Sequence, residues 1–403
     1  MRLIAIAAAL AAAACTTTPT TFSPRLAEPR LAVVDETNLT EAQREMLASR
    51  SGLNIYRTLA HHVDLYNRWS PLGQVLLNNQ SISPRHRELA MLRMGWLCQS
   101  PYEWSQHARI AKASAGISEA EVRAIAATPD SPAWSDIDRA VLKMADELRY
   151  DAIISDATWT ELRKVYTDAQ VMELLFTAAQ YQLVSMALNT LGIQVEPEAV
   201  DHMPTGITAP PLATRPTAQR LSRPRIAPVE SAQWTPEQRV LAAPQIRPDG
   251  SLFNLYKTML ANPRLYGPRV RFGSYLQRDS LLDPETRELL ILRTAWNIRT
   301  NYEWAHHVEA AKAAGLADAQ IAAIATGPSA PGWTTRQRAV LTAADELRRE
   351  AFISDATWSE LAAHFGMKER IEIVFTVGGY TMTGLAINSF GIQTEPGYPA
   401  MPS

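Results

Sequence analysis

Two pairs of acidic and imidazole side chains carry the clearest chemistry in this sequence of 403 residues. Glu103 and His107 are four residues apart, and Glu303 and His307 repeat that spacing. On a helix, residues four apart share one face, so each carboxylate would lie beside its imidazole. Such a pair can transfer protons in general acid/base catalysis, although in helical proteins it is more often a structural hydrogen bond. Spacing alone leaves both interpretations open.

A further glutamate lies upstream of each pair, in an apolar stretch rich in leucine. Glu88 precedes Glu103, and Glu288 precedes Glu303. Burial raises the pKa of a carboxyl group, and a neighbouring anion raises the pKa of a histidine. Both shifts bring these groups closer to the working pH, where acid/base catalysis is most efficient. Two helices that join the three groups would therefore form a candidate active site.

Signals for other chemistry are weaker. His306 and His307 with Glu303 have the composition of a metal site, but Gln106 stands in the place of the first histidine in the other copy. We therefore predict no metal and no cofactor. The sequence has no glycine-rich phosphate loop and no nucleophile elbow. The His61-His62 dipeptide is interpreted as a solvated helix end.

An internal repeat organises the chain, with an offset of about 200 residues between matching positions. We predict a leader at residues 1–15, a first repeat at 24–197, a linker at 198–218 that holds four prolines, and a second repeat at 219–398. The matching stretches include Leu53-Asn54-Ile55-Tyr56 with Phe253-Asn254-Leu255-Tyr256, Arg87-Glu88-Leu89 with Arg287-Glu288-Leu289, and Tyr102-Glu103-Trp104 with Tyr302-Glu303-Trp304.

Composition excludes several classes of protein. Hydrophobic residues make up 46% of the chain and charged residues 20%, a balance typical of globular proteins. A net charge of −2 offers no broad cationic surface, so nucleic acid is not an expected partner. With only two cysteines, Cys15 and Cys98, the chain has no disulfide scaffold and no zinc site of four thiolates.

The first fifteen residues have the pattern of an export signal. Arg2 precedes an apolar run from Leu3 to Ala14, which is too short to span a bilayer. Small residues directly before Cys15 are typical of a bacterial lipoprotein cleavage site, so we predict lipidation of Cys15 and an exported, periplasmic protein anchored to a membrane. Plain secretion and an uncleaved N-terminal helix are the alternatives. Beyond the leader we expect no membrane-spanning segment.

Within each repeat the hydrophobic periodicity is helical. Asp283 before Pro284 predicts the start of a helix, and Thr158 and Thr357, each followed three residues later by glutamate, predict capping boxes. Residues 171–191 and 371–390 are apolar almost all round and must be buried. We therefore predict an all-α protein in which two tandem copies of one helical domain pack as a pseudo-dimer.

One motif, present in both copies, resembles a known family. It reads Arg-Glu-Leu-x-x-Leu-Arg-x-x-Trp, then Tyr-Glu-Trp-x-x-His, then Ala-Gly at Ala115-Gly116 and Ala314-Gly315. This order is similar to the carboxymuconolactone decarboxylase-like superfamily, which includes the alkylhydroperoxidase D-type peroxidases, and the resemblance covers nearly all of both repeats. It implies an all-helical fold and assembly into homo-oligomers, usually trimers or hexamers.

The peroxidase branch of this superfamily carries a Cys-x-x-Cys-x-x-x-His motif. Its cysteines fall on Ser100 and Glu103 in the first repeat and on Thr300 and Glu303 in the second. None of these residues can supply a thiolate or a redox disulfide. Cys98 has no partner in its copy, so a peroxidase-like antioxidant activity is the alternative rather than the leading prediction.

The decarboxylase branch has a Glu-x-x-x-His arrangement at this place, and both copies retain it. The resemblance implies cysteine-independent acid/base catalysis on a small carboxylated or lactone substrate, in a carboxy-lyase. A non-enzymatic helical binding or assembly module is a third possibility. The implied roles are proton transfer for His107 and His307, orientation of these histidines for Glu103 and Glu303, a second acid/base for Glu88 and Glu288, substrate binding for Arg93 and Arg293, and a pocket wall for Tyr102 and Tyr302.

Overall fold

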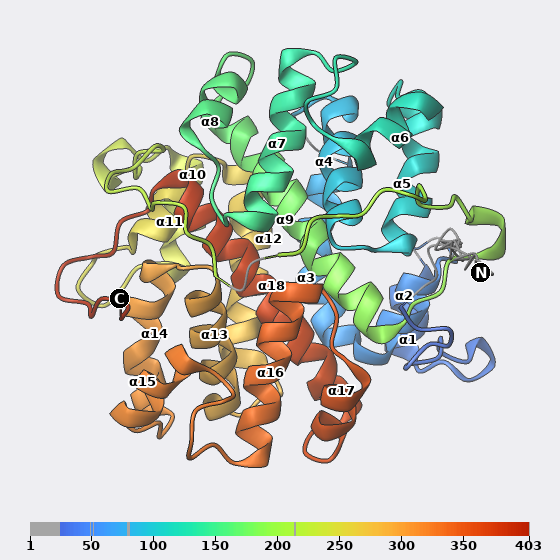
Figure 1. Cartoon of the computed structure of the whole chain (residues 1–403). Helices are drawn as coiled ribbons and strands as arrows, with labels where there is room; N and C mark the ends of the chain where they lie inside the picture. Colours follow the sequence, from blue (N-terminus) through green and yellow to red (C-terminus); the bar gives the residue numbers. More distant parts are fainter. Residues whose placement is uncertain (1–24, 49, 51, 79–80, 213–214, 403) are drawn as a thin grey trace, which may run out of the picture.

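The computed structural model describes residues 25–48, 50, 52–78, 81–212 and 215–402. Regular secondary structure in these residues is helical, without a strand (Figure 1). The all-α prediction is therefore confirmed. The predicted leader, with Cys15, lies outside the described residues.

The helices follow the same order in both halves of the chain. The first repeat contains η1 (Glu36–Asn38), α1 (Glu41–Ala48), α2 (Asn54–Leu59), η2 (Ala60–His62), α3 (Val63–Asn78), α4 (Pro84–Leu97), α5 (Pro101–Ser114), α6 (Glu119–Ala127), α7 (Asp136–Tyr150), α8 (Asp156–Arg163), α9 (Asp168–Leu191) and η3 (Pro197–Ala199). The second contains η4 (Ser231–Gln233), α10 (Pro236–Ala242), η5 (Ala243–Gln245), α11 (Asn254–Met259), α12 (Pro263–Ser274), the π-helix η6 (Tyr275–Asp279), α13 (Pro284–Asn297), α14 (Asn301–Ala313), α15 (Asp318–Thr326), α16 (Thr335–Glu350), α17 (Asp355–Ala362) and α18 (Met367–Phe390). The described residues between η3 and η4 carry no helix, and the exact limits of the repeats and the linker stay predictions.

Helix α13 begins where the sequence indicates. Asp283 is its N-cap, with a side-chain oxygen that accepts a hydrogen bond from the backbone of Thr286 at 3.0 Å. Pro284 occupies the first turn, where its missing N–H is not needed. The prediction for this helix start is confirmed.

The predicted capping boxes at Thr158 and Thr357 are wrong. Ser155 and Ser354 are the N-caps of α8 and α17, three residues earlier. The hydroxyl group of Thr158 instead donates to Glu147 at 2.7 Å. Each threonine lies within the first helical turn and binds a carboxylate on the preceding helix, a long-range contact that local spacing does not reveal.

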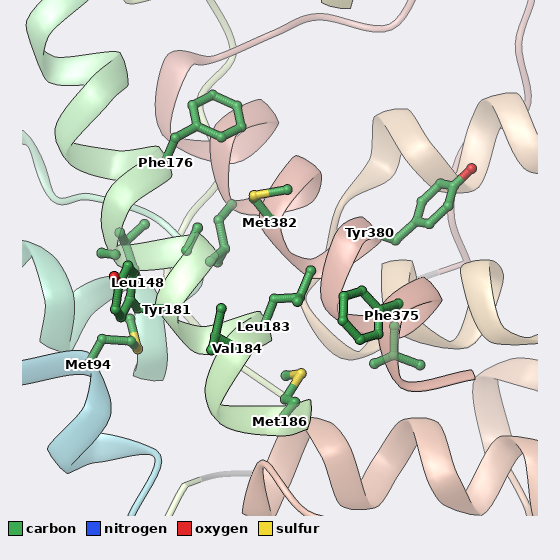
Figure 2. Packing of buried hydrophobic residues seen from close by; sticks show 14 of the residues in the cluster. Met94, Leu148, Phe176, Tyr181, Leu183, Val184, Met186, Phe375, Tyr380 and Met382 are labelled. Carbon is green, nitrogen blue, oxygen red and sulfur yellow. The ribbon is translucent and has the colours of Figure 1, made fainter. Parts of the chain in front are cut away.

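The two longest helices form the centre of the molecule. α9 and α18 pack against each other, and Figure 2 shows side chains that both helices contribute to this core, among them Leu183 and Val184 of α9 and Phe375 and Met382 of α18. Their approach is so close that a Cβ atom on Gly378 would lie 2.6 Å from Cγ of Leu183. Glycine is therefore required at this crossing.

Both central helices are long and apolar enough to cross a membrane. In the described protein, however, the apolar window of each helix is completely buried. α9 and α18 are therefore core helices, as the apolar pattern at 171–191 and 371–390 predicts.

Contacts between the repeats are reciprocal, as in a two-fold symmetric dimer. Arg149 Nη1 donates to the backbone oxygen of Arg348 at 2.6 Å, and Arg348 Nη1 donates to that of Arg149 at 2.7 Å. These bonds satisfy carbonyl groups at the C-terminal ends of α7 and α16, which lack partners within their own helices. The repeats thus pack as a pseudo-dimer.

One of these reciprocal contacts corrects an interpretation of the sequence. His62 is not a solvated helix end, because its side chain is 2% exposed and its Nε2 lies 2.9 Å from Oε1 of Glu372 in the other repeat. The symmetry-related pair is Asn262 with Glu173, whose atoms Nδ2 and Oε1 are 3.3 Å apart. The sequence could not indicate these pairings because the partners are more than 80 residues apart.

The buried carboxylate of Glu372 offers a test of the inter-repeat contact. Besides His62, it accepts hydrogen bonds from Tyr275 Oη at 2.5 Å, Ser280 Oγ at 2.5 Å and the backbone of Leu281 at 2.7 Å. We expect Glu372→Ala to lower the free energy of unfolding by about 3–5 kcal/mol, because several buried donors lose their acceptor. Urea titration measures the loss, and the exposed Glu237→Ala should change stability by less than about 0.5 kcal/mol. Equal effects of the two substitutions would contradict this role.

Candidate active site

A tight turn in each repeat brings together the two helices that carry the three titratable groups. In the second repeat it links α13 to α14 through Arg299, whose φ of +54° lies in the left-handed region; Gln99 has φ +51° in the first. Residues other than glycine rarely adopt this backbone conformation. Asn388 stabilises the turn, because its Nδ2 donates to the carbonyl oxygen of Ile298, the residue before Arg299, at 3.1 Å. α14 therefore folds back along α13, and Glu288 meets His307.

In the first repeat, all three predicted groups are buried and in contact. Nδ1 of His107 lies 2.7 Å from Oε2 of Glu88, and its Nε2 lies 3.6 Å from Oε2 of Glu103. Nε of Arg87 donates to the second oxygen of Glu88 at 2.9 Å. The ring of Tyr181 stands edge-on to the imidazole, with 4.7 Å between the centroids.

The pKa values of the two carboxyl groups in this cluster are shifted in opposite directions. Although burial acts in the opposite direction, His107 and Arg87 lower the pKa of Glu88. Burial opposes the charge of His107 as well, but the Glu88 carboxylate raises its pKa. Burial raises the pKa of Glu103 to about 7. Glu88 and His107 thus form an ion pair, beside which Glu103 titrates near neutral pH.

The second repeat keeps the hydrogen bond between the histidine and the upstream glutamate, but it lacks the contact between the histidine and the glutamate four residues before it. Nδ1 of His307 lies 2.7 Å from Oε2 of Glu288, and Tyr380 is edge-on to the ring with a centroid distance of 5.1 Å. Nε of Arg287 is 3.5 Å from the other Glu288 oxygen. Glu303, however, has both oxygens buried without a hydrogen-bond partner in the described protein. Its carboxyl group has turned away from the histidine.

A glycine on α18 makes room for this arrangement. A Cβ atom on Gly384 would lie 2.9 Å from Oε2 of Glu303, whereas the first repeat has Ser185 at this position. Burial raises the pKa of Glu303 well above its ordinary value, and Arg269 offsets only part of the shift. A buried carboxyl group without donors is far cheaper to keep neutral than charged. Burial therefore favours the protonated form of Glu303.

A cavity of about 540 Å³ adjoins these groups in the second repeat. Phe176, from α9 of the first repeat, contributes to its wall, so both repeats are needed to form it. This volume suits a small organic molecule. The polar and charged side chains of its wall include Arg269, Gln277, Glu288, Glu303, His306 and His307.

Larger side chains occupy the corresponding places in the first repeat. Arg269 corresponds to Trp69, whose ring packs edge-on against Phe375 at 5.3 Å. Gly379, on the cavity wall, corresponds to Gln180, which is 1% exposed. The two repeats have therefore kept the same Glu–His pair in different surroundings, with open space beside the second pair.

The predicted substrate-binding arginines have other partners. Nε of Arg93 donates to Asp146 at 2.6 Å, and Nε of Arg293 donates to Asp345 at the same distance. Each guanidinium group also donates to backbone carbonyl groups near the C-terminal end of α6 or α15, such as that of Ile324 in α15 at 2.7 Å. These arginines tie helices together, and the geometry does not support a role in substrate binding.

The predicted wall tyrosines divide between the repeats. Tyr302 lines the cavity, and its hydroxyl group donates to Glu395 at 3.2 Å. Tyr102 makes the matching bond to Glu196 at 3.0 Å. Only Tyr302 is therefore placed to contact a ligand of this cavity.

Sequence reasoning overlooked two features of the cavity, Arg269 and the surroundings of His306. The His306 ring is stacked between Tyr302 and Tyr398, with centroid distances of 4.3 and 4.1 Å. Its Nε2 lies 2.7 Å from Glu395, so the imidazole belongs to the wall. Among the described residues, no group of three or more His, Cys, Asp or Glu side chains has the arrangement of a metal site.

Cys98 does not belong to the cavity. It caps the C-terminal end of α4, is 1% exposed, and burial raises the pKa of its thiol. A reactive thiol needs accessibility and a lowered pKa. The peroxidase alternative therefore gains nothing from its position.

The buried acid of the second repeat predicts a pH-dependent stability. Above pH 4.5, the ordinary pKa, unfolded chains lose the Glu303 proton that folded chains keep. Relative to Glu303→Gln, the wild type should therefore lose about 1.4 kcal/mol of unfolding free energy per pH unit, until the folded group ionises. Urea unfolding of both proteins across the pH range measures this difference. A constant difference would contradict a protonated Glu303.

Solved structures with similar folds each cover less than half of this chain. A protein of unknown function from Agrobacterium tumefaciens is 21% identical, with a TM-score of 0.32, over 34% of this chain and 94% of its own. The debrominase Bmp8 is 15% identical, with a TM-score of 0.36, over 44% and 95%. The alkylhydroperoxidase AhpD core of a peroxidase-related protein from Ralstonia eutropha JMP134 is 19% identical, with a TM-score of 0.37, over 42% and 93%. No curated protein matches the chain.

The sequence pattern of a protein family identifies both halves of the chain. The carboxymuconolactone decarboxylase family matches residues 64–147 and, a second time, residues 263–346. The two matches span equivalent helices, α3 to α7 and α12 to α16. The family model thus matches once in each repeat, and the chain is a tandem, all-helical duplication of a domain similar to that of the carboxymuconolactone decarboxylase family.

Proposed function

We propose that the second repeat is a cysteine-independent acid/base catalyst that moves a proton to or from carbon in a small carboxylated or lactone substrate. The observation that carries the proposal is the convergence of the Glu288–His307 pair and the buried carboxyl group of Glu303 on one cavity of about 540 Å³. Similarity to the family supports enzyme chemistry of this class.

The hydrogen bond to Glu288 determines what His307 can do. A carboxylate accepts, so Nδ1 carries the proton of this bond and donates it at 2.7 Å. In the neutral imidazole, Nε2 then has a free lone pair. The pair resembles the arrangement in which a carboxylate orients a histidine base and stabilises the imidazolium that forms. His307 is therefore the proton-transfer group.

Glu303 supplies the complementary acid. Its neutral carboxyl group can donate a hydrogen bond to a carbonyl oxygen of the substrate, where negative charge develops as a carbon–hydrogen or carbon–carboxylate bond breaks. In a decarboxylation, the electron pair of the broken bond enters the conjugated carbonyl system and carbon dioxide leaves. His307, after taking a proton from solvent on Nε2, transfers this proton to the resulting carbanion and returns to the neutral imidazole. The net reaction consumes one proton and replaces a carboxylate by hydrogen.

The duplicated chain provides a matched pair of variants for this proposal. We expect His307→Ala to lower turnover by about 100-fold to 10,000-fold, the range for loss of a general acid/base. His107→Ala should leave turnover within about threefold, because the first repeat has the larger, buried side chains of Trp69 and Gln180 where the cavity of the second repeat has Arg269 and Gly379. Carbon dioxide release and deuterium uptake from heavy water, with a panel of unsaturated lactone carboxylic acids, measure both.

Controls separate chemistry from folding. Both variants should keep the helical circular dichroism and cooperative unfolding of the wild type. Equal losses in the two variants would contradict assignment of the chemistry to the second repeat. A wild type that turns over no member of the panel and exchanges no deuterium would favour the alternative of a helical binding module.

Two further proposals concern the setting of this activity. The apolar leader and Cys15 support export and attachment to a membrane by a lipid anchor. Family resemblance supports assembly into homo-oligomers. Membrane fractionation of the wild type and of Cys15→Ser tests the first proposal, because loss of the lipidation site should release the protein from the membrane fraction.

A further inference from the structure

Arg269 of α12 is a half-buried cation with an unusual set of neighbours. It lines the cavity, and its Nη2 donates to the hydroxyl group of Thr383 on α18. No carboxylate lies within ion-pairing distance of its guanidinium group in the part of the chain that the structure describes. Tyr256, Tyr380 and Glu303 act on it electrostatically, and burial raises the pKa of each of these groups, which favours their neutral forms. Arg269 thus faces the cavity with a charge that no protein group balances.

The fully buried arginines of this protein, in contrast, have partners for their charge. Arg93 and Arg293 each bind an aspartate through two nitrogen atoms. Arg149 and Arg348 donate to the negative ends of helices. Because even partial burial of an unbalanced charge is costly, the exception at Arg269, on the wall of the cavity, indicates that the missing anion is a ligand.

The surroundings of Arg269 are fitted to hold the guanidinium group. A Cβ atom on Gly273, one turn further along α12, would collide with Nη1 of Arg269. Thr383 fixes the other side. The first repeat has Trp69 and Val184 in place of Arg269 and Thr383, so the cation and its anchor are both absent there.

Several aromatic rings line the same cavity. Its rings are suited to a flat, unsaturated molecule. They are contributed by α11, α12, α14 and α18, and include Phe253, Tyr256, Phe272, Tyr302 and Tyr380.

We propose that Arg269 binds the carboxylate of a small, flat, unsaturated or aromatic acid in the second repeat. The inference rests on the proposed function and extends it, because anchoring the carboxylate on α12 decides which part of the molecule meets His307 and Glu303. Arg269 is thereby the residue that makes this cavity select acids over neutral analogues. The first repeat, with Trp69, does not bind such acids.

Equilibrium binding of two probes tests this selectivity. Benzoate and benzamide have the same ring and nearly the same shape, and only benzoate carries a negative charge. By isothermal titration calorimetry, we expect wild-type protein to bind one benzoate per chain at least about 10-fold more tightly than benzamide, as befits a charge-assisted hydrogen bond. Arg269→Gln should abolish the preference while leaving benzamide affinity within about threefold.

Three further proteins make the result specific. Arg269→Lys should keep part of the preference, because it keeps the charge, and the exposed Arg271→Gln on the same helix should keep all of it. His107→Ala, in the first repeat, should bind benzoate like the wild type. Because binding is measured without turnover, a failure of the proposed catalysis and a failure of this inference remain distinguishable. Unchanged selectivity in Arg269→Gln, or a wild type that does not prefer benzoate, would overturn the proposal.

Discussion

The Glu288–His307 hydrogen bond is the interaction on which the account of this protein depends. It joins two helices across a turn that contains a left-handed arginine, and it fixes both the position and the protonated nitrogen of the imidazole. Burial makes the bond valuable in both roles, because a carboxylate removed from water must have a partner. The same contact in the first repeat shows that it also serves the fold. Chemistry therefore requires more than the pair itself.

Catalysis also requires space for a substrate beside the pair, and the two repeats differ in this respect. The helices and their reciprocal contacts are retained in both repeats, since each repeat covers the core helix of the other. The side chains beside the two Glu–His pairs were free to diverge. Trp69 and Gln180 stand where the second repeat has Arg269 and Gly379. The cavity of the second repeat also has Phe176 of α9, from the first repeat, in its wall. One copy thus supports the other as a scaffold.

Features that depend on local spacing or on the family motif could be predicted from the sequence. The helix start at Asp283, the burial of α9 and α18, and the convergence of Glu88 with His107 belong to this group. They could be predicted because helical periodicity and the four-residue spacing are properties of neighbouring residues.

Features that depend on distant partners could not be predicted. Arg293 was expected to bind substrate because it belongs to the motif, but Asp345, fifty-two positions later, already neutralises it. The isolation of Glu303 requires Gly384 on another helix. Arg269 lies outside the motif, where an arginine is ordinarily a solvated surface residue. A position-by-position comparison of the repeats gives the one available signal, since few exchanges are as large as arginine for tryptophan.

The protonation and accessibility of the two histidines test this account most directly. Nitrogen-15 NMR of protein labelled at histidine, with His107→Ala and His307→Ala for assignment, reports both properties at a pH where the His307 imidazole is neutral. The account predicts that His307 carries its proton on Nδ1, and that benzoate shifts its Nε2 signal and leaves the signals of His107 unchanged. A proton on Nε2 of His307, or an equal response of both histidines to benzoate, would contradict it.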